Sequence, residues 1–218
     1  MARSTVAKVL KDHGLSPAPD RPASWRTFLR AHWGAIAGAD FFTSEVWTAR
    51  GLVTYYTRFV IDLSTRRVQV AGSSTPNPDA AFMARVACRL TDAVDGFLVH
   101  HRVLLCDRDT KWTDGFNRII EGAGVEIVRT PVQAPNANAH AERFVRSIRE
   151  ECLDRLILFG ERRLLRALDE YMAHYHRERN HQGLGNALIM PDAHPAPGTH
   201  VRCRERLGGL LRYYHRAA

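Results

Sequence analysis

The chain has 218 residues, a formal net charge of +8 and a sequence pI of about 9.8. This length suffices for one sizeable domain with appendages, and a hydrophobic share of 45% permits a packed core. No stretch approaches the roughly 20 apolar residues of a membrane span, and the N-terminus lacks the apolar segment of a signal peptide, so we expect a cytoplasmic protein with no membrane partner. The positive charge favours a polyanionic partner, with nucleic acid the leading choice.

The first part of the chain predicts a short helix and then a meander of strands. Residues 4–13 are typical of a helix, and the proline-rich segment 15–24 that follows suggests a boundary. Trp25 to Trp33 is expected to be helical. The next three apolar or β-branched segments have short connections, which predicts antiparallel pairing. These strands are predicted at residues 35–42, 52–62 and 68–73.

Helices and strands then alternate. Asp79 is expected to cap a helix whose apolar positions keep helical spacing as far as Phe97. A second amphipathic helix is predicted from Ala139 to a stop or kink at Gly160, and the C-terminal tail is expected to be helical or irregular. The remaining elements are strands at 103–106 and 125–128 and helices at 114–121 and 161–177. Three strands followed by helix–strand–helix–strand–helix predict an α/β fold, a mixed five-stranded sheet flanked by helices.

Three acidic residues stand at element ends. Asp40 lies in the first strand, Asp107 closes the fourth, and Glu142 falls in the first turns of the helix after the fifth. A strand–helix–strand step returns to the same sheet edge, so we expect the three to converge. Three close carboxylates need a neutralising cation, and oxygen ligands with open positions suit Mg²⁺. Two such ions would support an in-line displacement at phosphorus.

The sequence motifs around these acids resemble those of a known family. They are Ala39-Asp40-Phe41-Phe42, the run CDRDTKWT from Cys106 to Thr113, and the run PNANAHAER from Pro135 to Arg143. A downstream run, YHRERNHQGL from Tyr175 to Leu184, resembles a motif that follows the core in these proteins. Over about residues 25–195 the chain is therefore similar to the retroviral integrase and bacterial insertion-sequence transposase superfamily.

The resemblance implies a ribonuclease H-like fold and a DDE-type transposase or integrase that uses Mg²⁺ or Mn²⁺. In the family mechanism, water cuts at the end of a mobile element and the freed 3′-OH then attacks target DNA. Asp40 and Asp107 would bridge or bind the metal ions, and Glu142 would bind the second. The implied partners are element ends and target DNA, with a homo-oligomer assembled on them. The implied contacts to the DNA backbone are Lys111, Arg143, Arg146 and Arg149.

Two departures from the family pattern leave alternatives open. Arg108 follows the second Asp where many relatives have a small residue, so Asp109 is the alternative to Asp107; we favour Asp107 because it directly follows the apolar run. Residues 4–15 resemble only the last helix of a helix-turn-helix region. We therefore expect a remnant of that region with its linker at 1–24, a catalytic core at 25–160 and a C-terminal helix with a basic tail at 161–218. The rival functions are an inactive remnant or DNA-binding protein and a purely hydrolytic ribonuclease H-like nuclease.

Overall fold

The structure is a computed structural model that describes residues 12, 25–74, 78–109, 111–130, 138–191 and 200–217. The chain divides into two compact units, Met1–His32 and Trp33–Ala218. In the first unit the structure describes α2 (Trp25–His32), which confirms the helix predicted there. The predicted helix at 4–13, apart from Asp12, and the connector at 15–24 lie outside the described residues.

The second unit contains the predicted series of strands and helices, followed by further short elements. Its first half comprises η1 (Trp33–Ala35), β1 (Ile36–Thr48), β2 (Gly51–Asp62), β3 (Val68–Ser74), α3 (Ala80–Leu90) and β4 (Val103–Cys106). Its second half comprises α4 (Asp114–Gly122), β5 (Glu126–Arg129), α5 (Ala139–Glu151), η3 (Leu153–Arg155), α6 (Glu161–Arg177), η4 (Gln182–Leu184), β6 (His200–Arg206), η5 (Leu207–Gly209) and β7 (Leu211–Ala217).

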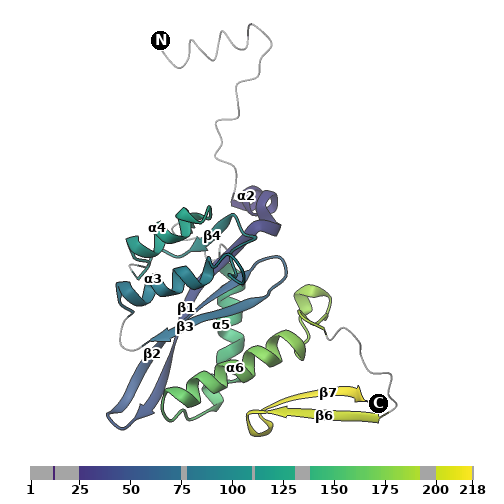
Figure 1. Ribbon diagram of the computed structural model, residues 1–218. Helices are drawn as coiled ribbons and strands as arrows, with labels where there is room; N and C mark the ends of the chain where they lie inside the picture. Colours follow the sequence, from purple (N-terminus) through teal and green to yellow (C-terminus); the bar gives the residue numbers. More distant parts are fainter. Residues whose placement is uncertain are drawn as a thin grey trace. The chain divides into compact units, whose positions relative to one another are not determined.

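A five-stranded sheet in the order β3-β2-β1-β4-β5 is the centre of this unit. β1, β2 and β3 form the predicted antiparallel meander, while β4 pairs with β1 and β5 with β4 in parallel. Figure 1 shows α3 and α4 together on one face of the sheet, with α5 and α6 on the other. This mixed sheet flanked by helices confirms the predicted fold class.

Successive side chains of the central strand β1 point to opposite faces of the sheet, and those near its start are buried on both faces. Ala37 and Ala39 belong to the core cluster that includes the inner faces of α3 and α4. Phe42, on the other face, contacts Phe59 of β2, whose ring lies 4.7 Å from that of Phe144 in α5. Even-numbered residues of β1 therefore face α5, and Asp40 is one of them.

Two helices end earlier than their apolar spacing predicts. α3 ends at Leu90, because the Asp92 side chain accepts from the backbone of Val94 and Asp95 and turns the chain; Val94 is 93% exposed. α5 ends at Glu151 instead of continuing to Gly160. The segment after η3 runs beside β1, where the backbone N–H of Trp47 donates to the Leu158 carbonyl at 2.8 Å. Strand-like pairing there replaces the expected helix.

The prediction of a helical or irregular tail was wrong for residues 200–217, which form the antiparallel hairpin β6–β7. Gly208 and Gly209, both at positive φ, allow the chain to reverse between the strands. Arg206 bonds the buried Glu178 carboxylate at 2.7 and 2.9 Å and Glu170 at 2.9 Å, which fixes β6 to the end of α6. These ion pairs join distant parts of the chain and leave no local sequence signal.

The described residues contain no helix that is both long and apolar enough to cross a membrane. All four cysteines are free thiols. Cys106 and Cys152 are buried, whereas Cys88 and Cys203 are exposed.

Candidate active site

Asp40 and Asp107 stand level with each other on neighbouring strands. The last parallel pair of β1 and β4 is Gly38 with Leu105, and each Asp follows two residues later. Neighbouring strands lie about 4.8 Å apart, so the backbones of Asp40 and Asp107 lie close together at one edge of the sheet. The predicted placement of both acids at that edge agrees with this register.

The Asp40 carboxylate is largely enclosed. Oδ1 accepts the backbone N–H of Phe41 at 2.8 Å, and Oδ2 accepts from Asn138 Nδ2, just before α5, at 3.4 Å. Burial, together with the charges of Asp107, Glu142 and Asp109, raises the pKa of Asp40 to about 6, although the hydrogen bond from Phe41 acts to lower it. The two other predicted acids are therefore within electrostatic reach of Asp40.

Glu142 lies in the first turn of α5 and is exposed. Across the described ranges, no group of three or more His, Cys, Asp or Glu side chains is arranged to hold a metal ion. The three acids are thus neighbours at electrostatic range, while coordination of a shared ion requires their side chains to move closer.

The donor set fits a hard cation. In the described part of the chain, Asp40, Asp107 and Glu142 form no ion pair with Lys or Arg, so their charges are available. Asn138 Oδ1 is buried and has no hydrogen-bond partner there. Carboxylates without cationic partners are an oxygen-rich environment of the kind that Mg²⁺ prefers.

Asp107 is oriented by residues outside the predicted site. Its Oδ1 accepts from the indole Nε1 of Trp112 at 2.5 Å and from the Asp109 backbone N–H at 3.2 Å. Arg129 Nη1 donates to the Asp107 carbonyl at 3.0 Å. Trp112 is buried in the core, 6% exposed, so its donor is held rigidly toward the carboxylate.

Asp109 has a different environment from Asp107. Lys111 Nζ and its backbone N–H both bond the Asp109 carboxylate at 2.8 Å. Burial acts to raise the pKa of Asp109, but the hydrogen bonds and charge of Lys111, together with the charge of Arg58, outweigh it and lower the pKa. Because Asp109 already has cationic partners, this environment favours Asp107 as the acid left for a metal.

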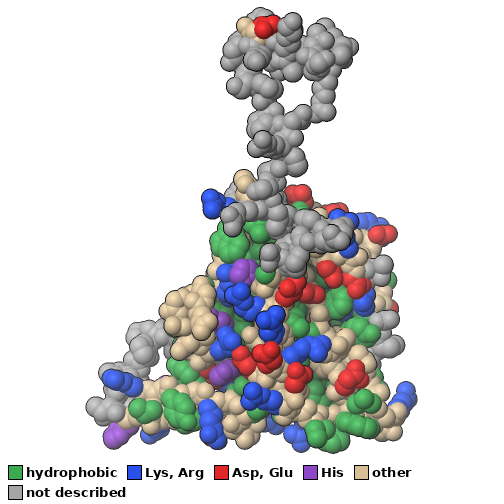
Figure 2. Space-filling view, turned by 180° about the vertical axis from the view of Figure 1, so that it is seen from behind, with side chains coloured by type: hydrophobic (Ala, Val, Ile, Leu, Met, Phe, Trp, Pro, Cys, Tyr) green, Lys and Arg blue, Asp and Glu red, His purple; other side chains and the backbone are tan. Residues whose placement is uncertain are grey.

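The four residues expected to hold DNA backbone have unequal freedom. Arg143 and Arg146 are exposed on α5. Arg149 instead donates to the Thr43 carbonyl at 3.2 Å, and Lys111 is paired with Asp109. Figure 2 shows Lys and Arg interspersed with Asp and Glu over the face seen from behind. Two of the four, Arg143 and Arg146, thus have the more open side chains.

Sequence reasoning missed Asn138 and Trp112 as supports of the acids. Asn138 lies inside the PNANAHAER motif, so its proximity to Glu142 was readable, but its bond to Asp40 depends on packing. Gly38 makes that packing possible: a Cβ at residue 38 would stand 2.9 Å from Asn138 Oδ1. Trp112 lies inside the CDRDTKWT run, but the bond from its indole N–H to Asp107 likewise depends on packing.

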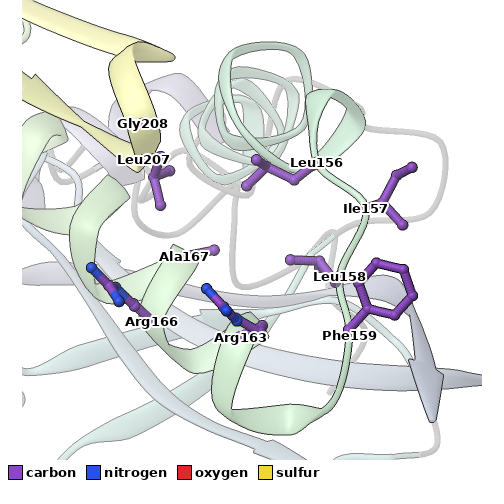
Figure 3. A pocket seen from close by; sticks show the side chains of 9 residues that line it. All are labelled: Leu156, Ile157, Leu158, Phe159, Arg163, Arg166, Ala167, Leu207 and Gly208. Atoms are coloured by element: carbon purple, nitrogen blue, oxygen red, sulfur yellow. The ribbon is translucent and has the colours of Figure 1, made fainter.

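A separate cavity of about 370 Å³ lies between α6, the α5–α6 connection and η5. Figure 3 shows Leu207 of the hairpin turn facing Leu156 across it, with Arg163 and Arg166 along α6. Its lining is apolar apart from these arginines and contains none of the three acids. It therefore offers no chemistry to the predicted site.

Part of the chain matches a known protein-family model, and its fold is similar to that of a solved structure. Residues 123–188 match the protein-family model for the integrase core domain. The catalytic domain of Mos1 mariner transposase is similar at 14% identity, with a TM-score of 0.50 over 68% of this chain and 74% of that one. This likeness shows a shared fold, and the predicted resemblance to the integrase-like superfamily is confirmed.

Two integrase cores are also similar in structure. The BIV integrase core has 12% identity and a TM-score of 0.47, covering 72% of this chain and 91% of that one. The HTLV-2 integrase core in complex with magnesium has 9% identity and a TM-score of 0.42, covering 66% and 85%. No curated protein sequence matches the chain.

Proposed function

We propose that this protein catalyses metal-dependent cleavage and strand transfer of DNA for a mobile element, as a DDE-type transposase or integrase. The observation that supports it most is the half-buried Asp40, its pKa raised in part by Asp107 and Glu142, at one edge of an integrase-like sheet. Strongly perturbed carboxylates in one cluster are typical of functional sites. We place the catalytic core at residues 25–160 of a cytoplasmic, DNA-bound homo-oligomer.

In this proposal Asp40, Asp107 and Glu142 hold Mg²⁺ or Mn²⁺. When bound, the divalent ions lower the pKa of an attacking hydroxyl and neutralise charge on the leaving oxygen. Trp112 fixes the rotamer of Asp107 through its indole N–H, and Asn138 orients Asp40 through its amide. These two bonds would hold the Asp107 and Asp40 side chains in place while the exposed Glu142 moves closer to them.

The basic residues have the complementary role of positioning DNA. Arg143 and Arg146 flank the acid on exposed sides of α5, where their guanidinium groups suit backbone phosphates. Lys111 stays beside Asp109 and lies 4.5 Å from the centre of the Phe41 ring, next to Asp40 in sequence. A backbone phosphate near Asp40 would therefore meet a preplaced ammonium group.

The full chain can be tested with labelled DNA that carries the terminal sequences flanking its coding region. Mg²⁺ or Mn²⁺ should support cleavage at the 3′ end and joining to a target plasmid. Asp40→Asn, Asp107→Asn and Glu142→Gln should each remove both products, and Asp109→Asn should retain them. Cleavage without joining would favour the nuclease alternative. No product with either metal would contradict the proposed activity.

A further inference from the structure

A second cavity, of about 350 Å³, lies between α5, the β2–β3 turn and the loop after α6, and its lining is largely polar. The loop belongs to the YHRERNHQGL run from Tyr175 to Leu184, to which neither the resemblance nor the proposed function gives a role. Three arginines line the cavity, Arg66, Arg143 and Arg179, and its described lining includes no Asp or Glu. A concave space with this bias of charge suits an anion.

Arg66 is the most constrained of these arginines. Its φ of 65° is in the left-handed region, which is strained for a residue with a side chain. The turn is nonetheless fixed, because Asp62 Oδ1 accepts the backbone N–H groups of Ser64 and Thr65 at 2.7 and 2.8 Å. Arg66 Nη1 is buried with no hydrogen-bond partner in the described chain. A strained turn thus presents an unsatisfied guanidinium donor.

The charges around the cavity are not balanced. Glu151 neutralises Arg179 through bonds of 2.7 to 3.0 Å. Burial lowers the pKa of Arg66, and the charge of Arg143 acts in the same direction, against the opposing influences of Tyr175 and Asp62. Arg143 has no ion pair with any described residue. Two like charges therefore face one space, and an anion between them would satisfy both.

We propose that this cavity binds a phosphate group between Arg66 and Arg143. Guanidinium forks match phosphate oxygens, and Ser147 in the same lining adds a hydroxyl donor. The phosphate is either a phosphodiester of a DNA strand or free inorganic phosphate. The DNA source rests on the proposed function: Arg143 directly follows Glu142, so a strand at the acids would have a neighbouring phosphate near this cavity.

The test compares the full chain with Arg66→Gly, Arg143→Gln and the control Arg118→Gln. Gly relieves the positive φ at position 66, so loss of binding cannot be attributed to backbone strain. Arg118 is exposed on α4 and outside the cavity lining, and its replacement removes the same charge. One arm measures thermal shift and titration calorimetry with inorganic phosphate. The other measures oligonucleotide binding by anisotropy at several salt concentrations.

Phosphate should stabilise the parent and Arg118→Gln, while Arg66→Gly and Arg143→Gln should bind it about tenfold more weakly or worse. If the source is DNA, these two variants should also bind oligonucleotide more weakly, each with a salt slope lower by about one. Unchanged DNA binding beside a lost phosphate response identifies free phosphate as the ligand.

The two proposals can fail separately. The cavity site is overturned if phosphate does not stabilise the parent and the variants bind DNA with the parent's affinity. This holds even if the parent cleaves DNA. A parent that binds phosphate but neither binds nor cuts DNA leaves the site standing and contradicts the proposed function.

Discussion

Asp40 and Asp107 occupy equivalent positions on adjacent parallel strands, each two residues beyond the Gly38–Leu105 register pair. The same alternation that places Asp40 on the α5 face places Gly38 there, directly under Asn138. The sheet therefore fixes the two aspartates through its register, and α5 reaches them through a close approach that only a missing side chain allows.

Gly38→Ala should impair DNA cleavage by tenfold or more with little loss of stability, within about 1 kcal/mol, since a strand favours Ala over Gly while the new methyl crowds Asn138. Asn138 would move away from Asp40 and carry the start of α5 with it. Cleavage rates and urea unfolding check this. Gly122→Ala, where a Cβ meets open space, is the control and should leave cleavage unchanged. Equal activity of both variants would contradict the positioning role.

Trp112→Phe should weaken Mg²⁺ binding by about tenfold, because it removes the donor to Asp107 while keeping an aromatic ring in the core. Calorimetric titration of Mg²⁺ measures the effect, and circular dichroism confirms the fold. Trp47→Phe is the comparison, since Trp47 is 50% exposed and lies near the far end of β1, seven residues beyond Asp40. A Trp112→Phe protein with parental metal affinity would show that Asp107 does not need this bond.

Glu178→Gln should reduce stability at neutral pH by about 3 kcal/mol. Burial alone would raise the pKa of Glu178, but hydrogen bonds from Arg206, His174 and Arg204 outweigh it and lower the pKa from 4.5 to about 2. A carboxylate with a depressed pKa stabilises the folded state fully above about pH 4.5, and this contribution disappears as the pH falls toward 2. The difference in unfolding free energy between parent and variant, measured by urea unfolding, should therefore shrink as the pH falls through that window.

The exposed Glu121 of α4 supplies the control. Glu121→Gln should have the same unfolding free energy as the parent at every pH. Hydrogen exchange should also increase in β6 and β7 of Glu178→Gln, because Arg204 and Arg206 lose their shared acceptor. A variant with parental exchange in the hairpin would refute the anchoring role of Glu178.

The sheet and its helices could be predicted because their signals are local. Strand 103–106 was predicted with its observed bounds, since a fully buried apolar run ends at the charged Asp107. The β6–β7 hairpin could not be, because its strands are mostly exposed and Arg206 is anchored by an acid 28 residues away. The early end of α5 was equally hidden, since the apolar spacing continues through Cys152 while pairing with Trp47 decides the fold.

The candidate site shows the same division. Asp40, Asp107 and Glu142 were recognisable from their motifs, and each lies at the element expected for it. The residues that orient the acids could not be predicted from the sequence, because the bond from Trp112 to Asp107 depends on packing. The unpartnered donor of Arg66 could not be predicted either, because it depends on a left-handed turn. The difference between Asp107 and Asp109 likewise emerges only from the Lys111 ion pair.

The most direct test of the central claim is the melting temperature of the metal-free protein as Mg²⁺ is added, for the parent, Asp107→Asn and Asp109→Asn. We predict a dose-dependent rise for the parent and Asp109→Asn, because the ion binds only the folded arrangement. Asp107→Asn should be as stable as the metal-free parent or slightly more so, through lower repulsion, and should not respond to Mg²⁺. A parent insensitive to Mg²⁺, with Asp107→Asn clearly destabilised, would contradict the account and make these acids structural.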